Sequence, residues 1–105
     1  MMKHIVMWKV YGNDREERLK SALQVKRAFE GIRDKIPGLI HLEVGIDTSL
    51  TDFACDAVLY SEFADAQSLA AYATHPEHLR VRDQLLGLRV SRHQVDYPLD
   101  GDRAS

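Results

Sequence analysis

Hydrophobic and polar positions alternate in four stretches of the chain, and a repeat of two is typical of β-strands. We expect these strands at residues 3–11, 39–46, 54–63 and 88–97. Between them, apolar residues recur every three to four positions, which predicts amphipathic helices at 15–35 and 66–74. A further helix is expected from Pro76 to about residue 86, because proline lacks an N–H and fits best at the first helical position.

The resulting order, βαββαβ, is the split pattern of ferredoxin-like α+β folds. The helices then cover one face of an antiparallel four-stranded sheet, with the first and third strands in the centre and the polar fourth strand at an edge. Both faces of the two central strands are largely apolar, so one apolar face stays uncovered. One possibility is that the open face carries Ile5, Met7, Val58 and Tyr60. The other is that it carries the residues that alternate with these four. We expect a second copy to pack on it, giving a homodimeric α+β barrel.

Composition agrees with a single small globular domain of 105 residues, 45% of them hydrophobic and 29% charged. We assign the domain to residues 1–97 and expect a flexible polar tail at 98–105. The net charge of −2 and the lack of a basic block argue against nucleic-acid binding, and no apolar run is long enough to span a membrane. With Cys55 as the single cysteine and no signal peptide, we expect a cytoplasmic protein.

The stretch from Tyr72 to His78 carries the candidate chemistry. A helix that starts at Pro76 places His75 at its cap and His78 in its first turn, where the helix dipole disfavours a positive charge. A histidine that stays neutral near pH 7 is able to act as a general base. The same spacing also fits a plain helix break, with His75 capping the helix and His78 on the surface.

A metal site has little support from the sequence. His75 and His78, together with Asp56 or Glu77, offer ligand atoms. The His-Glu-x-x-His pattern is missing, however, and no cysteine partner accompanies the histidines. We therefore expect neither a bound metal nor a cofactor.

Six short motifs follow one another along the chain: Lys3–Lys9, Ile36–Gly38, Glu43–Gly45, Ser61–Phe63, Tyr72–His78 and Val95–Tyr97. In this order they resemble the stress-responsive dimeric α/β-barrel (Dabb) family, which includes the plant olivetolic acid cyclase. The resemblance extends over nearly the whole chain. It implies a ferredoxin-like protomer and a barrel built from two sheets, as the strand pattern does independently.

The resemblance also implies a small apolar pocket between the sheet and the helices. His78 would be its general base, Tyr72 the orienting or binding partner of that base, and His4 a second polar residue. The substrate-binding residues would be His4, Trp8, Phe29, Ala57 and Leu59. Ala57 and Phe29 stand where the plant cyclase has a histidine and a tyrosine, so the ligand is expected to differ from the plant substrate.

Three functions follow as alternatives. The first is a cofactor-free polyketide cyclase or lyase-like enzyme, in which His78 removes a proton next to a carbonyl group of a small hydrophobic or aromatic ligand. The second is a non-catalytic stress or small-ligand-binding protein that uses the same pocket. The third is a cofactor-free or haem-type monooxygenase, which rests on the shared fold alone.

Overall fold

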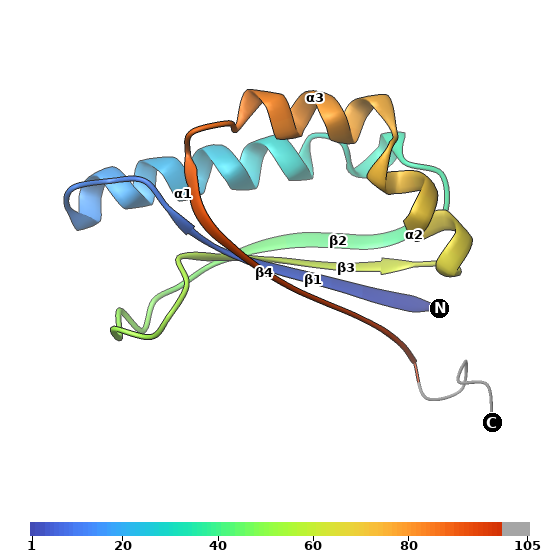
Figure 1. Ribbon diagram of the computed structural model, residues 1–105, viewed down its shortest axis with the longest axis horizontal. Coiled ribbons are helices and arrows are strands. Elements are labelled where there is room, and N and C mark those ends of the chain that lie inside the picture. The colour runs from blue at the N-terminus through green and yellow to red at the C-terminus, as the bar shows by residue number, and fades with distance from the viewer. Residues whose placement is uncertain (100–105) are drawn as a thin grey trace.

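One four-stranded sheet with all of its helices on one face forms the protein, as a computed structural model describes it for residues 1–99 (Figure 1). The elements in chain order are β1 (Met2–Val10), α1 (Arg15–Glu30), the 3-10 helix η1 (Arg33–Lys35), β2 (Leu39–Ile46), β3 (Ala57–Phe63), α2 (Ala66–Ala73), α3 (Pro76–Gln84) and β4 (Arg89–Pro98). The strands are antiparallel in the order β2-β3-β1-β4, so β1 and β3 are central and β4 is an edge. The predicted ferredoxin-like topology is therefore confirmed.

Helix α1 begins where its capping residues place it and ends earlier than the sequence predicted. The Asp14 side chain accepts a hydrogen bond from the backbone N–H of Glu17, which makes Asp14 the N-cap. Gly31 caps the other end, and the chain then forms η1 instead of continuing as α-helix to Lys35. Glycine has a low helix propensity, so a helix that reaches it loses stability there.

The core lies between the helices and the facing side of β1 and β3. These two strands contribute every second residue to it: His4, Val6, Trp8, Val10, Ala57, Leu59, Ser61 and Phe63. The register pairs Val6 with Leu59 and Trp8 with Ala57, so the two buried rows lie side by side. From α1, the core receives Ala22, Val25 and Phe29. The predicted alternation of the central strands is thus correct.

Three apolar residues of the predicted helices and strands are exposed: Leu19, Ile40 and Leu86. Leu19 lies about 100° around α1 from the centre of the buried stripe. Ile40 sits at a register shift in β2, between Leu39 and His41. Leu86 follows the end of α3, in the turn before β4.

The structure decides between the two possible open faces. Ile5, Met7, Val58 and Tyr60 lie on the side of the sheet away from the helices, and Met7 is 40% exposed. The loop between β2 and β3 also projects to this side (Figure 1). Strand β4 adds Val95 and Tyr97 to the same face, since they pair with Ile5 and Lys3. An apolar surface thus remains on a protomer whose helices cover the other side.

The expected tail falls mostly outside the described residues. Pro98, its first predicted residue, is the last residue of β4, and the Leu99 N–H donates to the Met1 carbonyl. Residues 100–105 are not described. Among residues 1–99, no helix has the length and apolar character needed to cross a lipid bilayer.

Candidate functional site

The break between α2 and α3 positions the candidate catalytic residues. Pro76 is the first residue of α3, and the His75 side chain caps the helix by accepting a hydrogen bond from the Glu77 N–H through Nδ1, at 3.1 Å. This capping role for His75 agrees with the sequence analysis. His78 follows in the first turn of α3, as expected.

His78 packs against Tyr72, the last buried residue of α2. Their ring centroids are 4.3 Å apart, with an angle of 41° between the planes. His78 Nδ1 lies 3.2 Å from the carbonyl oxygen of Ala73. A carbonyl oxygen only accepts, so Nδ1 carries the proton and the lone pair of a neutral His78 is on Nε2. This hydrogen bond thereby holds His78 in the tautomer whose proton is on Nδ1, and it leaves the basic nitrogen Nε2 unused.

The environment of His78 favours its neutral form. Partial burial lowers the pKa of the imidazole below its ordinary value of 6.5, and the hydrogen bond to Ala73 opposes this only in part. Electrostatic interactions with His4, Arg89 and Arg82 lower the pKa of His78 further. His78 is therefore neutral at pH 7, which is the state that a general base requires.

Tyr72 holds a hydroxyl group that is buried and unpaired. The residue is 3% exposed, and its hydroxyl oxygen has no hydrogen-bond partner among the described residues. Burial raises the pKa of the Tyr72 phenol well above its usual value, so the group remains protonated. An unpaired buried hydroxyl costs about 1–3 kcal/mol, and such groups in native proteins are commonly found at functional sites.

His4 is a further ring neighbour of Tyr72. The two ring centroids are 6.0 Å apart, and His4 also contacts Phe63 edge-on. His4 Nδ1 hydrogen-bonds the carboxylate of Asp96, its direct partner across the β1–β4 pair. The structure thus brings His4, Tyr72 and His78 together through ring contacts, while the hydrogen bonds of the two histidines go to other groups.

Sequence reasoning missed the role of Asp96. The chain stretch around it was noted only as a family motif, although a carboxylate on the helix-facing side of β4 is unusual for an edge strand packed on a core. The signal becomes visible when β4 is paired against β1, because His4 and Asp96 then fall opposite each other. A register cannot be read from the alternation of either strand alone.

The predicted apolar substrate-binding residues are packed into the core. Trp8 and Phe29 stack at 5.2 Å, and Ala57 and Leu59 lie beside them on β3. All four are at most 3% exposed. They form the layer next to which Tyr72 and His4 are buried. Trp8 also borders a cavity on the helix side of the sheet.

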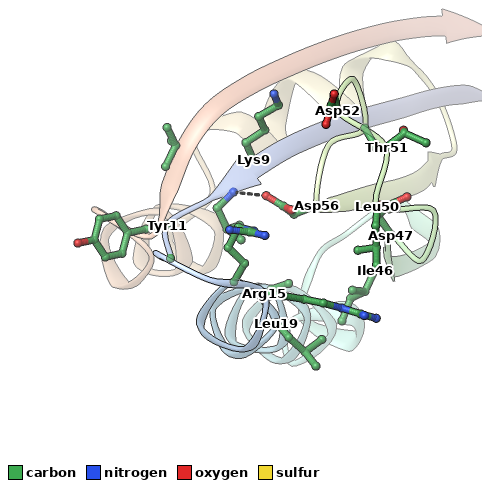
Figure 2. Close-up of a pocket in the computed structure, with 16 residues that line it drawn as sticks. Lys9, Tyr11, Arg15, Leu19, Ile46, Asp47, Leu50, Thr51, Asp52 and Asp56 are labelled. Atoms are coloured by element: carbon green, nitrogen blue, oxygen red, sulfur yellow. Dashed lines mark hydrogen bonds between the residues drawn. The ribbon is translucent and has the colours of Figure 1, made fainter.

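None of four surface cavities in the described part of the chain is lined by His4, Tyr72 or His78. One of 490 Å³ lies between the end of β1, the start of α1 and the loop after β2 (Figure 2). Its lining mixes both charges, with Lys9 and Arg15 among the cations and Asp47 among the acids. Gly12 is needed in its wall, since a Cβ there would lie 2.6 Å from the Arg18 nitrogen.

Asp56 has a structural role in that cavity wall. Its carboxylate accepts a hydrogen bond from the Val10 N–H at 2.8 Å, which ties the start of β3 to the end of β1 (Figure 2). Among residues 1–99, no three His, Cys, Asp or Glu side chains are grouped to hold a metal ion.

Arg89 is a second residue that sequence reasoning did not single out. Its guanidinium carbon lies 5.6 Å from the centroid of the Trp8 ring, and one of its nitrogens donates to the Arg82 carbonyl at 3.5 Å. Burial lowers the pKa of Arg89, and the nearby charge of Arg92 lowers it further. A partly buried cation thus lies next to the aromatic cluster, in electrostatic reach of Tyr72 and His78.

Comparison with known proteins places this geometry in a family. A dimeric protein of unknown function and ferredoxin-like fold from Bacteroides fragilis is 34% identical, with a TM-score of 0.81 over 93% of this chain and 95% of that one. Hydroxynitrile lyase from Passiflora edulis has a TM-score of 0.77 over 98% and 96% of the two chains, at 12% identity, which shows a shared fold.

A curated relative extends beyond this chain. The stress-response A/B barrel domain-containing protein DABB1 of Arabidopsis thaliana is 27% identical over 104 residues, which are 92% of this chain and 46% of that protein. The chain therefore spans about half the length of this curated relative. The model of the stress responsive A/B barrel domain, Dabb, matches residues 2–99. The chain belongs to the stress-responsive A/B barrel domain family.

Proposed function

We propose that this protein is a cofactor-free, lyase- or cyclase-like enzyme that removes a proton from a carbon next to a carbonyl group in a small hydrophobic or aromatic ligand. The observation that carries the proposal is the arrangement of His78. The Ala73 carbonyl binds its Nδ1–H, burial keeps the ring neutral, and the lone pair of Nε2 remains for the ligand.

In this reaction His78 Nε2 takes the proton as the C–H bond breaks, and the electron pair moves into the carbonyl group to form an enolate. The hydroxyl of Tyr72 donates a hydrogen bond to the developing enolate oxygen, because its raised pKa keeps it protonated and it has no other partner. The enolate carbon then attacks a second carbonyl group of the same ligand, whose oxygen takes the proton from His78 as the new carbon–carbon bond forms. Alternatively, the enolate carbon takes that proton back itself. Either path returns His78 to its neutral form.

The remaining predicted site residues have supporting roles in this proposal. The Asp96 carboxylate fixes the ring of His4 next to Tyr72. Trp8, Phe29, Ala57 and Leu59 form an apolar surround that keeps water away from the enolate. Low local polarity strengthens the hydrogen bond from Tyr72 in the transition state.

A non-catalytic ligand-binding protein is the second candidate, and one observation favours it. His78 is oriented by a neutral carbonyl and not by a carboxylate, so the imidazolium formed on proton transfer receives less stabilisation. The unpaired hydroxyl of Tyr72 would serve a bound carbonyl ligand equally well without any reaction.

We further propose that the protein is a homodimer that packs through its open sheet face. The centre of this face is apolar, with Met7 and Val58 next to each other, while Lys3 and Glu62 lie toward its rim. An apolar centre with a polar rim is the usual composition of a protein interface. The relative from Bacteroides fragilis is a dimer with the same fold, which supports the same assembly here.

Exchange of carbon-bound hydrogen for deuterium tests the enzymatic proposal without knowledge of the natural ligand. Acetophenone and phenylpyruvate are incubated with the protein in heavy water, and the loss of the signal next to the carbonyl is followed by NMR. The wild type should accelerate the exchange of at least one compound, and His78→Ala should reduce the acceleration by about 10²–10⁴-fold. If both compounds bind but neither exchanges faster than in buffer, the ligand-binding candidate replaces the enzyme.

A further inference from the structure

A cavity of 230 Å³ lies between β4 and the turn that follows α3, next to the aromatic cluster. Its polar lining comes from Trp8, Arg89, Ser91 and Arg92. Trp8 is 1% exposed, and its indole nitrogen has no hydrogen-bond partner among residues 1–99. A buried indole N–H usually has a hydrogen-bond acceptor, so the cavity wall holds a donor for which the described residues provide no acceptor.

Strand register brings both arginines to this side of the sheet. Arg92 pairs with Trp8 and Arg89 with Val10, across a register shift between Lys9 and Val10. Trp8 and Val10 both face the helices, so their partners on β4 face them as well. Arg89 lies over the Trp8 ring, with 5.6 Å from its guanidinium carbon to the ring centroid. Two cations and an indole N–H therefore share one small cavity.

No carboxylate in the described part of the chain neutralises these two arginines. Two acids of α3 and β4 bind other groups: Asp83 pairs with Arg82, and Asp96 binds His4 and Gln94. Arg82 adds a third positive charge, which acts on Arg89 together with Arg92. Arg89 is partly buried and Arg92 is exposed. Neighbouring cations without a counter-ion repel each other in the protein alone, and a bound anion would relieve the repulsion.

We propose that this cavity binds the oxyanion group, a carboxylate or phosphate, of an organic ligand whose body extends to Tyr72 and His78. Guanidinium and indole groups only donate hydrogen bonds, so the complementary group has to be an acceptor. The volume is below the range of about 300–1,000 Å³ typical of sites that enclose a whole drug-sized ligand, so the cavity suits a headgroup. The position of the ligand body rests on the proposed function. The anion site itself does not depend on it.

Trp8 is the single tryptophan of the chain, so its fluorescence reports directly on this cavity. The intact protein is titrated with phenylacetate, with phenyl phosphate and with the neutral phenylacetamide. At least one of the two anions should change the fluorescence saturably and bind at least about tenfold more tightly than the amide, since a hydrogen bond to a charged group contributes about 1.5–3 kcal/mol. The tighter of the two anions identifies carboxylate or phosphate as the group recognised. Added salt should weaken anion binding but not amide binding.

Arg92→Gln and Arg89→Gln should each weaken binding of the preferred anion about tenfold. Arg33→Gln is the matched control, because it removes one positive charge from an exposed arginine paired with Glu30, outside this cavity, and it should bind as the wild type does. Arg89 also packs on Trp8, so each variant is checked by thermal melting. Exposed Arg92 supplies the result if Arg89→Gln unfolds.

The outcomes separate this inference from the proposed function. If the anions bind through the arginines but no compound exchanges hydrogen, the anion site stands and the enzyme proposal falls. If the amide binds as tightly as the anions, if no ligand changes the fluorescence, or if Arg92→Gln binds with wild-type affinity, the anion site is refuted whatever the exchange assay shows.

Discussion

The rings of Tyr72 and His78 are in contact at 4.3 Å although the two residues belong to different helices. In one continuous helix, two residues six positions apart point about 120° away from each other. The break at His75 and Pro76 changes the direction of the chain, and the Ala73 carbonyl at the end of α2 then becomes the hydrogen-bond partner of His78. The helix break is therefore what brings Tyr72 and His78 together.

Tyr72→Phe should separate function from stability. The substitution removes a buried hydroxyl that has no partner, so the free energy of unfolding should stay the same or rise by about 1 kcal/mol. Deuterium exchange of a ligand should slow, though by less than in His78→Ala, since the base is still present. Urea denaturation and the NMR exchange assay measure the two quantities. A clear loss of stability would show that the hydroxyl has a partner in the folded protein.

The pH dependence of stability should reveal the lowered pKa of His78. In the folded protein the imidazole resists protonation, whereas in the unfolded chain it takes up a proton near its ordinary pKa of 6.5. The contribution of His78 is therefore fully present above about pH 6.5 and is lost as the pH falls through the folded pKa. Urea denaturation at about pH 8 and at about pH 5 should show a smaller decrease for His78→Asn than for the wild type. Equal decreases would contradict a lowered pKa.

The protein's βαββαβ order and its open apolar face were predictable because both follow from local alternation. Residues such as Val6 and Leu59 alternate with Ile5 and Val58, and each strand shows this pattern on its own. What alternation leaves undecided is which of the two rows faces the helices. The structure decides this, and the buried row is the one with Trp8 and His4.

The polar part of the candidate site was predictable only in part. Tyr72 and His78 lie close in the sequence, on either side of a proline that predicts the start of a helix. Asp96 and Arg89, in contrast, join the site through the pairing of β4 with β1, where a register shift also intervenes. Such a register depends on packing across the whole sheet, so a carboxylate or a guanidinium on an edge strand looks like ordinary surface when the strand is taken alone.

Phe29→Ala should destabilise the fold strongly. Phe29 is 1% exposed and stacks on Trp8, so its removal leaves a cavity in the centre of the helix–sheet layer. The expected loss in the free energy of unfolding is about 3–5 kcal/mol, measured by urea denaturation. Leu19→Ala is the control, because Leu19 lies on the same helix but is 46% exposed, and it should lose less than about 1 kcal/mol. A loss that small for Phe29→Ala would make Phe29 a wall of an open pocket.

Val58→Asp should convert the protein from a dimer to a monomer. Val58 lies in the middle of the open face, paired with Met7 and Gly45, and a carboxylate there is tolerated while the face is in water. In a dimer that packs through this face the same carboxylate is buried without a partner, which costs several kcal/mol. Light scattering should find twice the protomer mass of 12.0 kDa for the wild type and 12.0 kDa for the variant. Leu86→Asp is the control, because Leu86 lies beyond the end of α3 and is 82% exposed. This variant should leave the dimer intact. A wild type that remains monomeric at all concentrations, or a Val58→Asp dimer as stable as that of the wild type, would rule out packing through this face.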